Sequence, residues 1–392
     1  METLHISAEC FPAAKVGGLA DVVGALPKYL NRREVISRVV IPCYQNKFRK
    51  ENLWENTYSG NINLGIETFS FSIQREQTNK LGFELYVVDL PELLKEENPY
   101  GYTNDIERHL GFQIAVVNWI SSMKKKPDVI HCHDHHTGLI AFMMNYCNEY
   151  VALKSIPTVF TIHNGNYQGW IGWEKENLLP AFDLAKRGML EWNNCINSMA
   201  CAIKCCWRFT TVSEGYLEEL SKAALGLESL IRSEKQKAIG ILNGIDTEVW
   251  DPETDPMIEK NYGIEKAEKG KKKNKEALCK SFQFENDKPL FAFIGRLVAD
   301  KGADLLPNAI TQIVLLEKLD VNFIVLGSGS ADYENNLKQL KERFPKNFNC
   351  VIGYNEKLAH LIYAGSDFLL MPSRTEPCGL NLLYALRYGT VP

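Results

Sequence analysis

The chain lacks three features that would each narrow its class at once: a long apolar run, a surplus of basic charge and an N-terminal leader. No stretch of its 392 residues approaches the roughly 20 consecutive apolar residues of a membrane helix. The formal net charge of −4 argues against a protein that binds nucleic acid as a whole. The first residues, METLHISAEC, show neither the basic segment nor the apolar core of a signal peptide. We therefore expect a cytoplasmic protein with no membrane or nucleic-acid partner.

The cysteines form no paired motif. There are 11 of them, an odd number, and no two are spaced as C-x-x-C. A secreted disulfide framework and a ribbon-like zinc site are therefore both disfavoured. Most of the cysteines stand among apolar residues, which is typical of small buried side chains in a reducing compartment.

The pattern along the chain is a repeated alternation of short apolar strands and amphipathic helices. Such alternation predicts parallel sheets covered by helices, an α/β fold. The length favours two domains, with ligands bound at the carboxyl ends of the strands in a cleft. Residues 62–76 alternate differently and predict an antiparallel hairpin at a sheet edge. We expect a first domain over 1–245, a connector over 246–288 and a second domain over 289–392.

The expected connector contains the run KAEKGKKKNK, at 266–275. A lysine run of this kind could bind an acidic polymer. More often it is a solvated, mobile segment, and we favour that interpretation.

The stretch AAKVGGLADVVGAL, at 13–26, lies where a strand gives way to a helix that we expect to end near Pro27. A helix start exposes backbone N–H groups, glycines let an anion approach closely, and Lys15 adds a full charge. Gly17 and Gly18 therefore fit a phosphate or sugar-phosphate cradle. They also fit a simple tight turn beside a surface lysine, since the pattern is neither G-x-G-x-x-G nor a P-loop.

Four of the eight histidines stand in HCHDHH, at 131–136. The metal-binding pattern H-x-H-x-D-H would need aspartate at position 135, but it stands at 134. On a strand, His131 and His133 share a face and Asp134 points to the other. We expect no metal here, and instead expect Asp134 at the strand end as a hydrogen-bond acceptor or base.

Two later stretches carry charge at turns. In GRLVADKG, at 295–302, Arg296 and Lys301 can converge on one diphosphate, although two surface cations would look the same. In SRTEPCGL, at 373–380, Glu376 precedes a helix start. A carboxylate beside helix-start amides suits sugar hydroxyls, or is an acidic N-cap.

Six motifs then occur in order along essentially the whole chain: KVGGLADVVGALPKYL, HCHDHHTGL, TIHNGNYQGW, NGIDTEVWDPETDP, GRLVADKG and PSRTEPCGLNLLYALRYGT. Together they resemble the bacterial glycogen synthases and starch synthases of glycosyltransferase family 5. The resemblance implies the GT-B fold, in which two Rossmann-like domains have parallel sheets facing a central cleft. It also implies transfer of glucose from ADP-glucose to the non-reducing end of an α-1,4-glucan, with retention of the anomeric configuration. Family members continue beyond the sequence YGTVP, so we expect an incomplete second domain.

The resemblance also implies roles for individual residues. Asp134 lies near the acceptor side, and His163 approaches the glucose with its ring on a hydroxyl and its carbonyl near the anomeric carbon. The other donor-site residues of the first domain are Lys15, Gly17, Gly18, Asp21, Asn164 and Asn243. In the second domain Arg296 and Lys301 hold the diphosphate, and Tyr354 stacks on the adenine. The glucose hydroxyls are held by Glu376 and the amides of Cys378, Gly379 and Leu380.

The chemistry needs neither metal nor cofactor on this interpretation. No carboxylate pair of the glycosidase kind is evident, so we favour a front-face mechanism in which the departing phosphate takes the acceptor proton. One departure stands at Leu382, where the family usually has glutamine. Two alternatives stay open: a related retaining transferase that uses UDP-glucose, and a glucan-binding fragment without catalysis.

Overall fold

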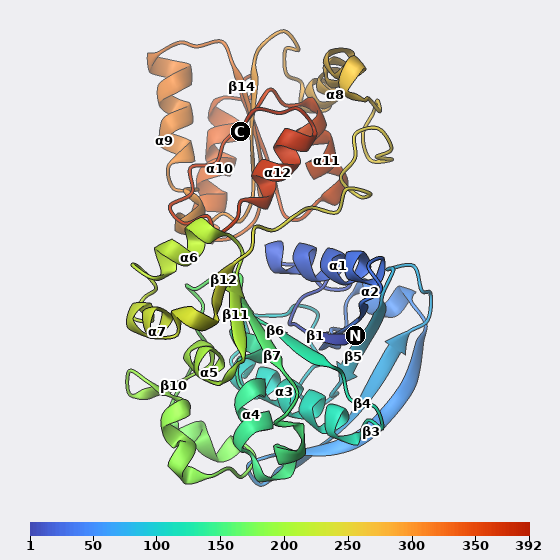
Figure 1. Cartoon of the computed structure of the whole chain (residues 1–392). Coiled ribbons are helices and arrows are strands. Elements are labelled where there is room, and N and C mark those ends of the chain that lie inside the picture. The colour runs from blue at the N-terminus through green and yellow to red at the C-terminus, as the bar shows by residue number, and fades with distance from the viewer. The chain divides into compact units, whose positions relative to one another are not determined.

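The computed structural model describes residues 1–392 and divides the chain into two compact units. The first comprises Met1–Asn243, blue to yellow-green in Figure 1, and the second comprises Gly244–Pro392, yellow to red. The division therefore falls two residues before the expected end of the first domain.

The first unit is built on a nine-stranded sheet in the order β12-β11-β7-β6-β1-β2-β5-β4-β3. Seven neighbouring strands are parallel, as the alternation predicted. Their bounds are β1 (Glu2–Ile6), β2 (Ile36–Pro42), β5 (Glu84–Asp89), β6 (Val129–His133), β7 (Thr158–Ile162), β11 (Arg208–Thr211) and β12 (Ala238–Gly240).

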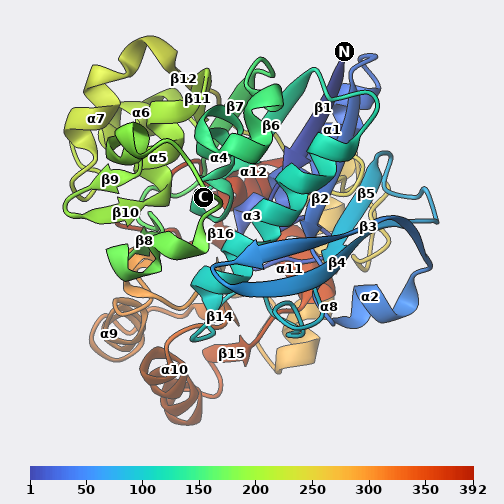
Figure 2. The same ribbon diagram turned by 90° about the horizontal axis from the view of Figure 1, so that it is seen from below.

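The predicted hairpin is confirmed at the sheet edge and is longer than expected. It consists of β3 (Trp54–Leu64) and β4 (Glu67–Glu76), and β4 pairs antiparallel with β5. Gly65 opens the two-residue loop with φ 62, a left-handed conformation that glycine adopts without steric cost. The two long strands run side by side in Figure 2.

Helices cover both faces of this sheet, as Figure 1 shows for α1 (Gly18–Asn31) and α3 (Asp105–Ser122). Val39 and Ile41 of β2 share a buried cluster with Val23 of α1. On the opposite face, the ring centroids of Tyr86 in β5 and Trp119 in α3 lie 5.0 Å apart. A strand buried on both sides explains the near-continuous apolar runs of the sequence.

The expectation that α1 ends near Pro27 is wrong, because the helix continues to Asn31. Proline lacks only its own N–H, and residues beyond it keep helical bonding, since the amide of Arg32 donates to the carbonyl of Lys28.

The remaining elements of the unit are short: α2 (Lys47–Glu51), α4 (Ile140–Tyr146), α5 (Ser198–Cys205), α6 (Glu214–Leu220), α7 (Glu228–Ser233) and the small sheet of β8 (Trp170–Ile171), β9 (Glu191–Trp192) and β10 (Cys195–Asn197).

The second unit has a four-stranded parallel sheet in the order β15-β14-β13-β16. The strands are β13 (Leu290–Ile294), β14 (Asn322–Gly327), β15 (Phe348–Ile352) and β16 (Phe368–Leu369). Its helices are α8 (Ala267–Phe282), α9 (Leu306–Thr311), α10 (Ala331–Arg343), α11 (Glu356–Gly365) and α12 (Leu380–Arg387). The helix α9 continues as a π-helical turn over Gln312–Leu316.

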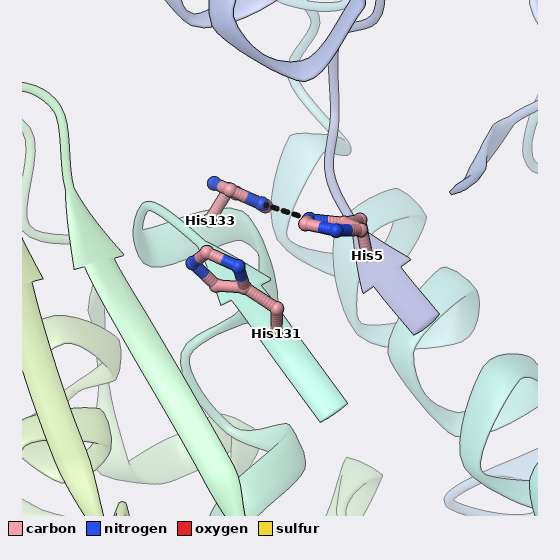
Figure 3. A group of neighbouring side chains, drawn as sticks. All are labelled: His5, His131 and His133. Carbon is pink, nitrogen blue, oxygen red and sulfur yellow. Dashed lines mark hydrogen bonds between the residues drawn. The ribbon is translucent and has the colours of Figure 1, made fainter. Parts of the chain in front are cut away.

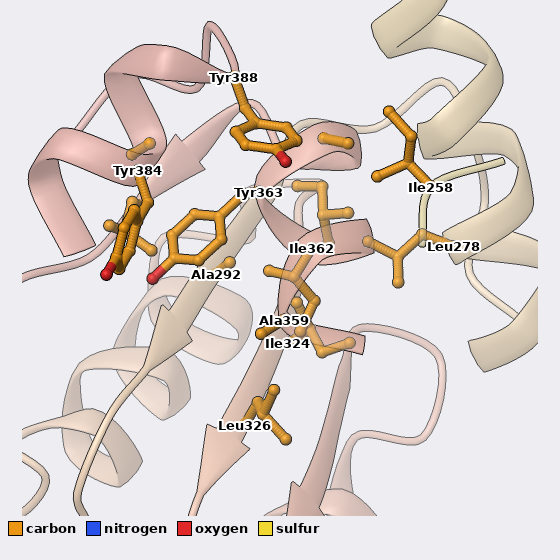
Figure 4. Close-up of a cluster of buried hydrophobic side chains, with 14 of the residues drawn as sticks. Ile258, Leu278, Ala292, Ile324, Leu326, Ala359, Ile362, Tyr363, Tyr384 and Tyr388 are labelled. Atoms are coloured by element: carbon orange, nitrogen blue, oxygen red, sulfur yellow. The ribbon is translucent and has the colours of Figure 1, made fainter. Parts of the chain in front are cut away.

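The prediction of a mobile connector over 246–288 is wrong. Most of the lysine run lies in α8, and Leu278 of that helix packs with Ile258, Ile324 and Ile362 in the core of the second unit (Figure 4). Gly270 and Asn274 of α8 are also buried, and Lys271 is half-buried. The lysine-rich composition of this stretch gave no sign that the helix packs on the core. Burial lowers the pKa of the Lys271 ammonium to about 8, and its Nζ lies 2.7 Å from the Thr390 hydroxyl.

A buried polar cluster links Asp255, in the stretch before α8, to His360 of α11 and to Tyr388, which follows α12. The Asp255 carboxylate accepts hydrogen bonds from Nδ1 of His360 at 2.7 Å and from the Tyr388 hydroxyl at 2.6 Å. Burial alone would lower the pKa of His360, but the bond to Asp255 and the charges of Asp255 and Glu356 outweigh it and raise that pKa. The indole of Trp250 stacks on the His360 ring at 3.8 Å. The cluster therefore buries a hydrogen-bonded pair of His360 and Asp255 beneath the Trp250 ring.

None of the helices combines the length and apolarity needed to cross a bilayer. The structure pairs none of the 11 cysteines in a disulfide, and nine of them are buried.

We predict that Asp255→Ala lowers the free energy of unfolding of the second unit by about 3–5 kcal/mol, because it removes the buried carboxylate that bonds both the His360 ring and the Tyr388 hydroxyl. Since the folded pKa of His360 is raised, its contribution is complete below the ordinary value of 6.5 and is lost as the pH rises through the folded value. The difference between the two proteins should therefore shrink at alkaline pH.

Urea titrations followed by amide hydrogen exchange in the second unit measure this difference. Glu276→Ala is the control, because its carboxylate forms an exposed pair with Lys273 and should change stability by less than about 0.5 kcal/mol. Equal losses in the two variants would show that the buried cluster adds no stability.

Candidate functional site

In the first unit, the residues singled out from the sequence follow the carboxyl ends of parallel strands. Lys15, Gly17 and Gly18 come after β1, Asp134 follows β6, and His163 follows β7. Asn164 adjoins His163, and Asn243 lies beyond β12. Because the strands run parallel, these loops all lie along one edge of the sheet.

The loop before α1 is held by a carboxylate that the sequence did not single out. Oε2 of Glu9 accepts from the amides of Val16 at 2.6 Å and Gly17 at 3.0 Å, and Oε1 accepts from the Tyr100 hydroxyl at 2.8 Å. Burial raises the pKa of Glu9, although the two amides oppose the change. The expectation that the amides of this loop lie open to an anion is therefore wrong for Val16 and Gly17.

The ammonium of Lys15 forms an ion pair in this loop. Its Nζ lies 2.8 Å from Oδ1 of Asp21 and 5.0 Å from the centre of the Phe11 ring. A Cβ added at Gly17 would meet no atom within 4 Å, and φ there is an ordinary −147. Nothing inside the unit demands glycine at this position, so the open space beside it is compatible with close approach by a ligand.

Asp134 has a strained backbone at the end of β6. Its φ of 56 and ψ of 175 fall in a region that is essentially restricted to glycine and costs about 1–3 kcal/mol. The conformation turns the carboxylate toward β7, where Oδ1 accepts from the amide of His163 at 2.7 Å and, more weakly, from that of Asn164 at 3.5 Å. The structure thus brings Asp134, His163 and Asn164 together.

The carboxylate of Asp134 is almost fully buried. Burial raises its pKa to about 7, the two amides of His163 and Asn164 act in the opposite direction, and the charge of Glu9 adds to the rise. A carboxyl that changes charge near neutral pH suits proton or hydrogen-bond exchange with a substrate.

Three histidines gather beside Asp134, and Figure 3 shows their rings facing one another from β1 and β6. One ring nitrogen from each of His5, His131 and His133 lies within 4.8 Å of the others, a spacing that could hold a metal ion. Both nitrogens of His133 are already bonded, however: Nε2 lies 3.2 Å from Nδ1 of His5, and Nδ1 lies 3.0 Å from Nε2 of His163. A metal would have to displace one of these bonds.

The second unit brings together two of its candidate residues. Nζ of Lys301 lies 2.7 Å from Oε2 of Glu376 and also donates to the carbonyl of Thr375 at 3.1 Å. The Ser373 hydroxyl donates to the same carboxylate oxygen at 2.9 Å. A cation suited to a phosphate and a carboxylate suited to sugar hydroxyls therefore stand side by side.

The other candidates of this unit lie on either side of that pair in the sequence. Arg296 is half-buried and follows β13. Arg374, which the sequence did not single out, donates to the Asp304 carboxylate through two bonds of 2.7 and 2.8 Å. Gly379 is the N-cap of α12 with φ 76, which explains glycine there, and Leu380 begins the helix. Cys378 is half-buried just before it.

Tyr354 and Leu382 lie on the surface of the same unit. The ring of Tyr354 is 64% exposed and its hydroxyl donates to the carboxylate of Glu356, so the aromatic face is accessible for stacking. Leu382 lies in the first turn of α12 and is 36% exposed, so its apolar side chain is not needed for the core.

Sequence reasoning missed three residues: Glu9, which bonds the amide of Gly17, Tyr100, which bonds Glu9, and His5, which bonds His133. Single acidic, histidine and tyrosine residues carry no motif by themselves. The one available signal was position: Glu9 and His5 flank the end of the first strand, as Asp134 and His163 flank the ends of theirs.

Comparisons with known proteins identify similar sequences and a similar structure over the whole length of the chain. The family model of the starch synthase catalytic domain matches residues 2–233, and that of glycosyl transferases group 1 matches residues 274–392. The glycogen synthases of Flavobacterium johnsoniae and Lactobacillus acidophilus are 56% and 37% identical to the chain, covering all of it and 83% of each relative. The catalytic domain of starch synthase IV from Arabidopsis thaliana, solved with ADP and acarbose, superposes with a TM-score of 0.91 at 30% identity, over all of this chain and 82% of that one.

We predict that Asp134→Asn stabilises the first unit increasingly as the pH rises. The folded pKa of about 7 exceeds the ordinary 3.8, so the native state retains a proton that the unfolded chain releases between these values. The wild type therefore loses stability from pH 4 to pH 8, by about 3–4 kcal/mol at most, whereas asparagine does not titrate.

Denaturant unfolding at several pH values measures the difference. Asp128→Asn is the control, because this exposed carboxylate also accepts a backbone amide, that of Glu2 at 2.7 Å. A difference between Asp134→Asn and the wild type that stays constant with pH would contradict a raised pKa at Asp134.

Proposed function

The chain belongs to the family of the bacterial glycogen synthases and starch synthases, and from this premise we propose that its substrates are ADP-glucose and an α-1,4-glucan such as glycogen. It is a glycosyltransferase of the GT-B fold. Transfer goes to the non-reducing end of the glucan with retention of the anomeric configuration. The observation that carries the proposal is the contact between Lys301 and Glu376, which pairs a phosphate-binding cation with a sugar-binding carboxylate.

The second unit supplies the donor-binding groups. Arg296 and Lys301 bind the diphosphate, and the exposed ring of Tyr354 stacks on the adenine. Glu376 and the amides of Cys378, Gly379 and Leu380 bind the glucose hydroxyls. Negative charge accumulates on the leaving ADP, so cations fixed at the diphosphate stabilise the transition state more than the ground state.

The first unit supplies groups for the glucose and the acceptor. The His163 ring binds a sugar hydroxyl and its carbonyl faces the anomeric carbon. Asp134 holds the backbone that bears this carbonyl, through its bond to the His163 amide. Lys15, Gly17, Gly18 and Asp21 complete the donor side, together with Asn164 and Asn243.

The reaction proceeds at the front face of the sugar. The bond between the anomeric carbon and the phosphate oxygen breaks while the acceptor hydroxyl oxygen bonds to the same carbon. The acceptor proton passes to the departing phosphate oxygen, so ADP leaves with it. No second carboxylate is required as a nucleophile, in contrast to the retaining glycosidases.

We propose that the reaction needs neither a metal nor a cofactor. The His5, His131 and His133 group is the one place that suggests a metal, and there both nitrogens of His133 are engaged by other histidines. We also place the reaction in the cytoplasm, in keeping with cysteines that form no disulfide.

The proposal is tested by measuring ADP release from ADP-glucose with glycogen in the presence of a chelator, beside UDP release from UDP-glucose. We expect turnover of ADP-glucose that the chelator leaves intact, and well under one equivalent of metal in the purified protein. Preference for UDP-glucose would assign a different donor. Glucan binding without turnover of either donor would favour a binding protein, and a stoichiometric metal whose removal abolishes activity would overturn the metal-free mechanism.

We predict that Lys301→Ala lowers kcat by roughly two to three orders of magnitude, as for loss of one preorganised charge at a transition state. Affinity for glucan should barely change, because the acceptor does not contact the diphosphate. Lys338→Ala, which removes an exposed lysine of α10, is the matched control. Steady-state kinetics with both substrates decide the matter: a kcat within about threefold of the wild type would rule out Lys301 as a diphosphate ligand.

A further inference from the structure

Three imidazoles form a continuous hydrogen-bonded chain across three neighbouring strands. Nδ1 of His5 lies 3.2 Å from Nε2 of His133, and Nδ1 of His133 lies 3.0 Å from Nε2 of His163. The first link is the dashed line in Figure 3. The three residues are at most 8% exposed, so solvent does not compete for these bonds.

All three rings are neutral in the folded protein. Burial is the main cause that lowers the pKa of each: well below the ordinary value for His5 and His133, and to about 3 for His163. A neutral imidazole has one N–H and one lone pair. Because His133 uses both nitrogens, it must donate to one neighbour and accept from the other, and the chain can point in only two directions.

The far end of the chain distinguishes the two directions. Nε2 of His5 is buried and has no hydrogen-bond partner. If the chain points from His5 to His163, this atom carries an unpaired lone pair. If it points the other way, the same atom carries an unpaired N–H, and orphaned buried N–H groups are the rarer case in proteins. The first direction is therefore favoured.

We infer that His5 and His133 are positioning residues that hold the His163 ring in its Nδ1–H tautomer. Nε2 of His163 accepts from His133, so the proton must sit on Nδ1, the ring nitrogen that does not take part in this bond. The ring thus presents a donor, rather than an acceptor, to the oxygen of a substrate hydroxyl. This inference rests on the proposed function only in taking the substrate hydroxyl as the partner of that donor.

The tautomer can be read without substrate. Histidine labelled with ¹⁵N in the full chain gives separate signals for protonated and unprotonated ring nitrogens, and His163→Gln assigns the signal of His163. We expect the proton of His163 on Nδ1 in the wild type. A proton on Nε2 would overturn the inference. Because no turnover is needed, a protein that fails to use ADP-glucose would disprove the proposed function and leave this measurement valid.

Three variants test the consequence for catalysis. His133→Phe removes both links, whereas His133→Asn retains an N–H near the position of Nδ1. His131→Phe is the matched control: this ring stacks on His133 at 4.1 Å, but its Nε2 is bonded to the Thr161 hydroxyl at 2.7 Å, outside the chain.

We expect His133→Phe to lower kcat about tenfold, as for loss of one well-placed hydrogen bond, with the donor KM changed less than about threefold. His133→Asn should recover most of the loss, and His131→Phe should stay within about twofold. The ¹⁵N spectrum of His133→Phe should show both tautomers of His163. A kcat in His133→Phe equal to that of His131→Phe, or no recovery in His133→Asn, would overturn the positioning role.

Discussion

The parallel register of β1, β6 and β7 is the constraint on which the candidate site of the first unit depends. It pairs His5 with His131, and His133 with Thr161, two residues before His163. Since side chains alternate along a strand, His131 and His133 fall on the same face, next to His5 on the neighbouring strand. A one-residue slip of β6 would turn both rings to the other face and break the chain to His163. The sheet therefore fixes both which histidines meet and in what order.

The end of β6 shows what this arrangement costs. Asp134 combines a backbone conformation that is rare outside glycine with a buried carboxyl whose pKa is raised to about 7. Both features oppose folding, and both are tolerated because the strands on either side determine where the chain must go. In exchange, one carboxylate oxygen of Asp134 bonds the amide of His163 and Nδ1 of His133 bonds the ring of His163, so both the backbone and the side chain of that residue are held in place.

Periodicity predicted the alternation of buried parallel strands with amphipathic helices, and the hairpin at the sheet edge, because such elements carry regular apolar patterns. It did not predict the short strand β11. Periodicity did not predict that α8 packs against the core, because two of the residues that it buries, Gly270 and Asn274, are not apolar, whereas Leu278 fits the apolar pattern. A Cβ at Gly270 would come within 2.3 Å of Tyr262, so only glycine fits at this contact. Glycine is not counted as an apolar residue when the periodicity of a sequence is analysed.

The same reasoning applies to the site itself. Motifs placed Asp134, His163, Lys301 and Glu376 at strand ends and turns, and the structure joins them in two pairs. His5 carries no motif, because its partner, the ring of His133, is distant in sequence, and only the register of the folded sheet reveals the contact. Glu9 bonds the amide of Gly17 within the loop that follows β1, and periodicity does not describe the conformation of such a loop.

The ion pair between Lys301 and Glu376 affects which ligands bind favourably to the second unit. Each charge of this pair is satisfied by the other, so neither group is left desolvated without a partner. Both side chains are partly exposed, at 20% and 33%, so the attraction between them is screened by water and can be given up at modest cost. A donor carrying a diphosphate and a sugar offers a better partner to each group at once: anionic oxygens to the ammonium and hydroxyl protons to the carboxylate. A ligand with only one of these parts would satisfy one charge and weaken the pair that held the other, which favours the complete nucleotide sugar over either fragment.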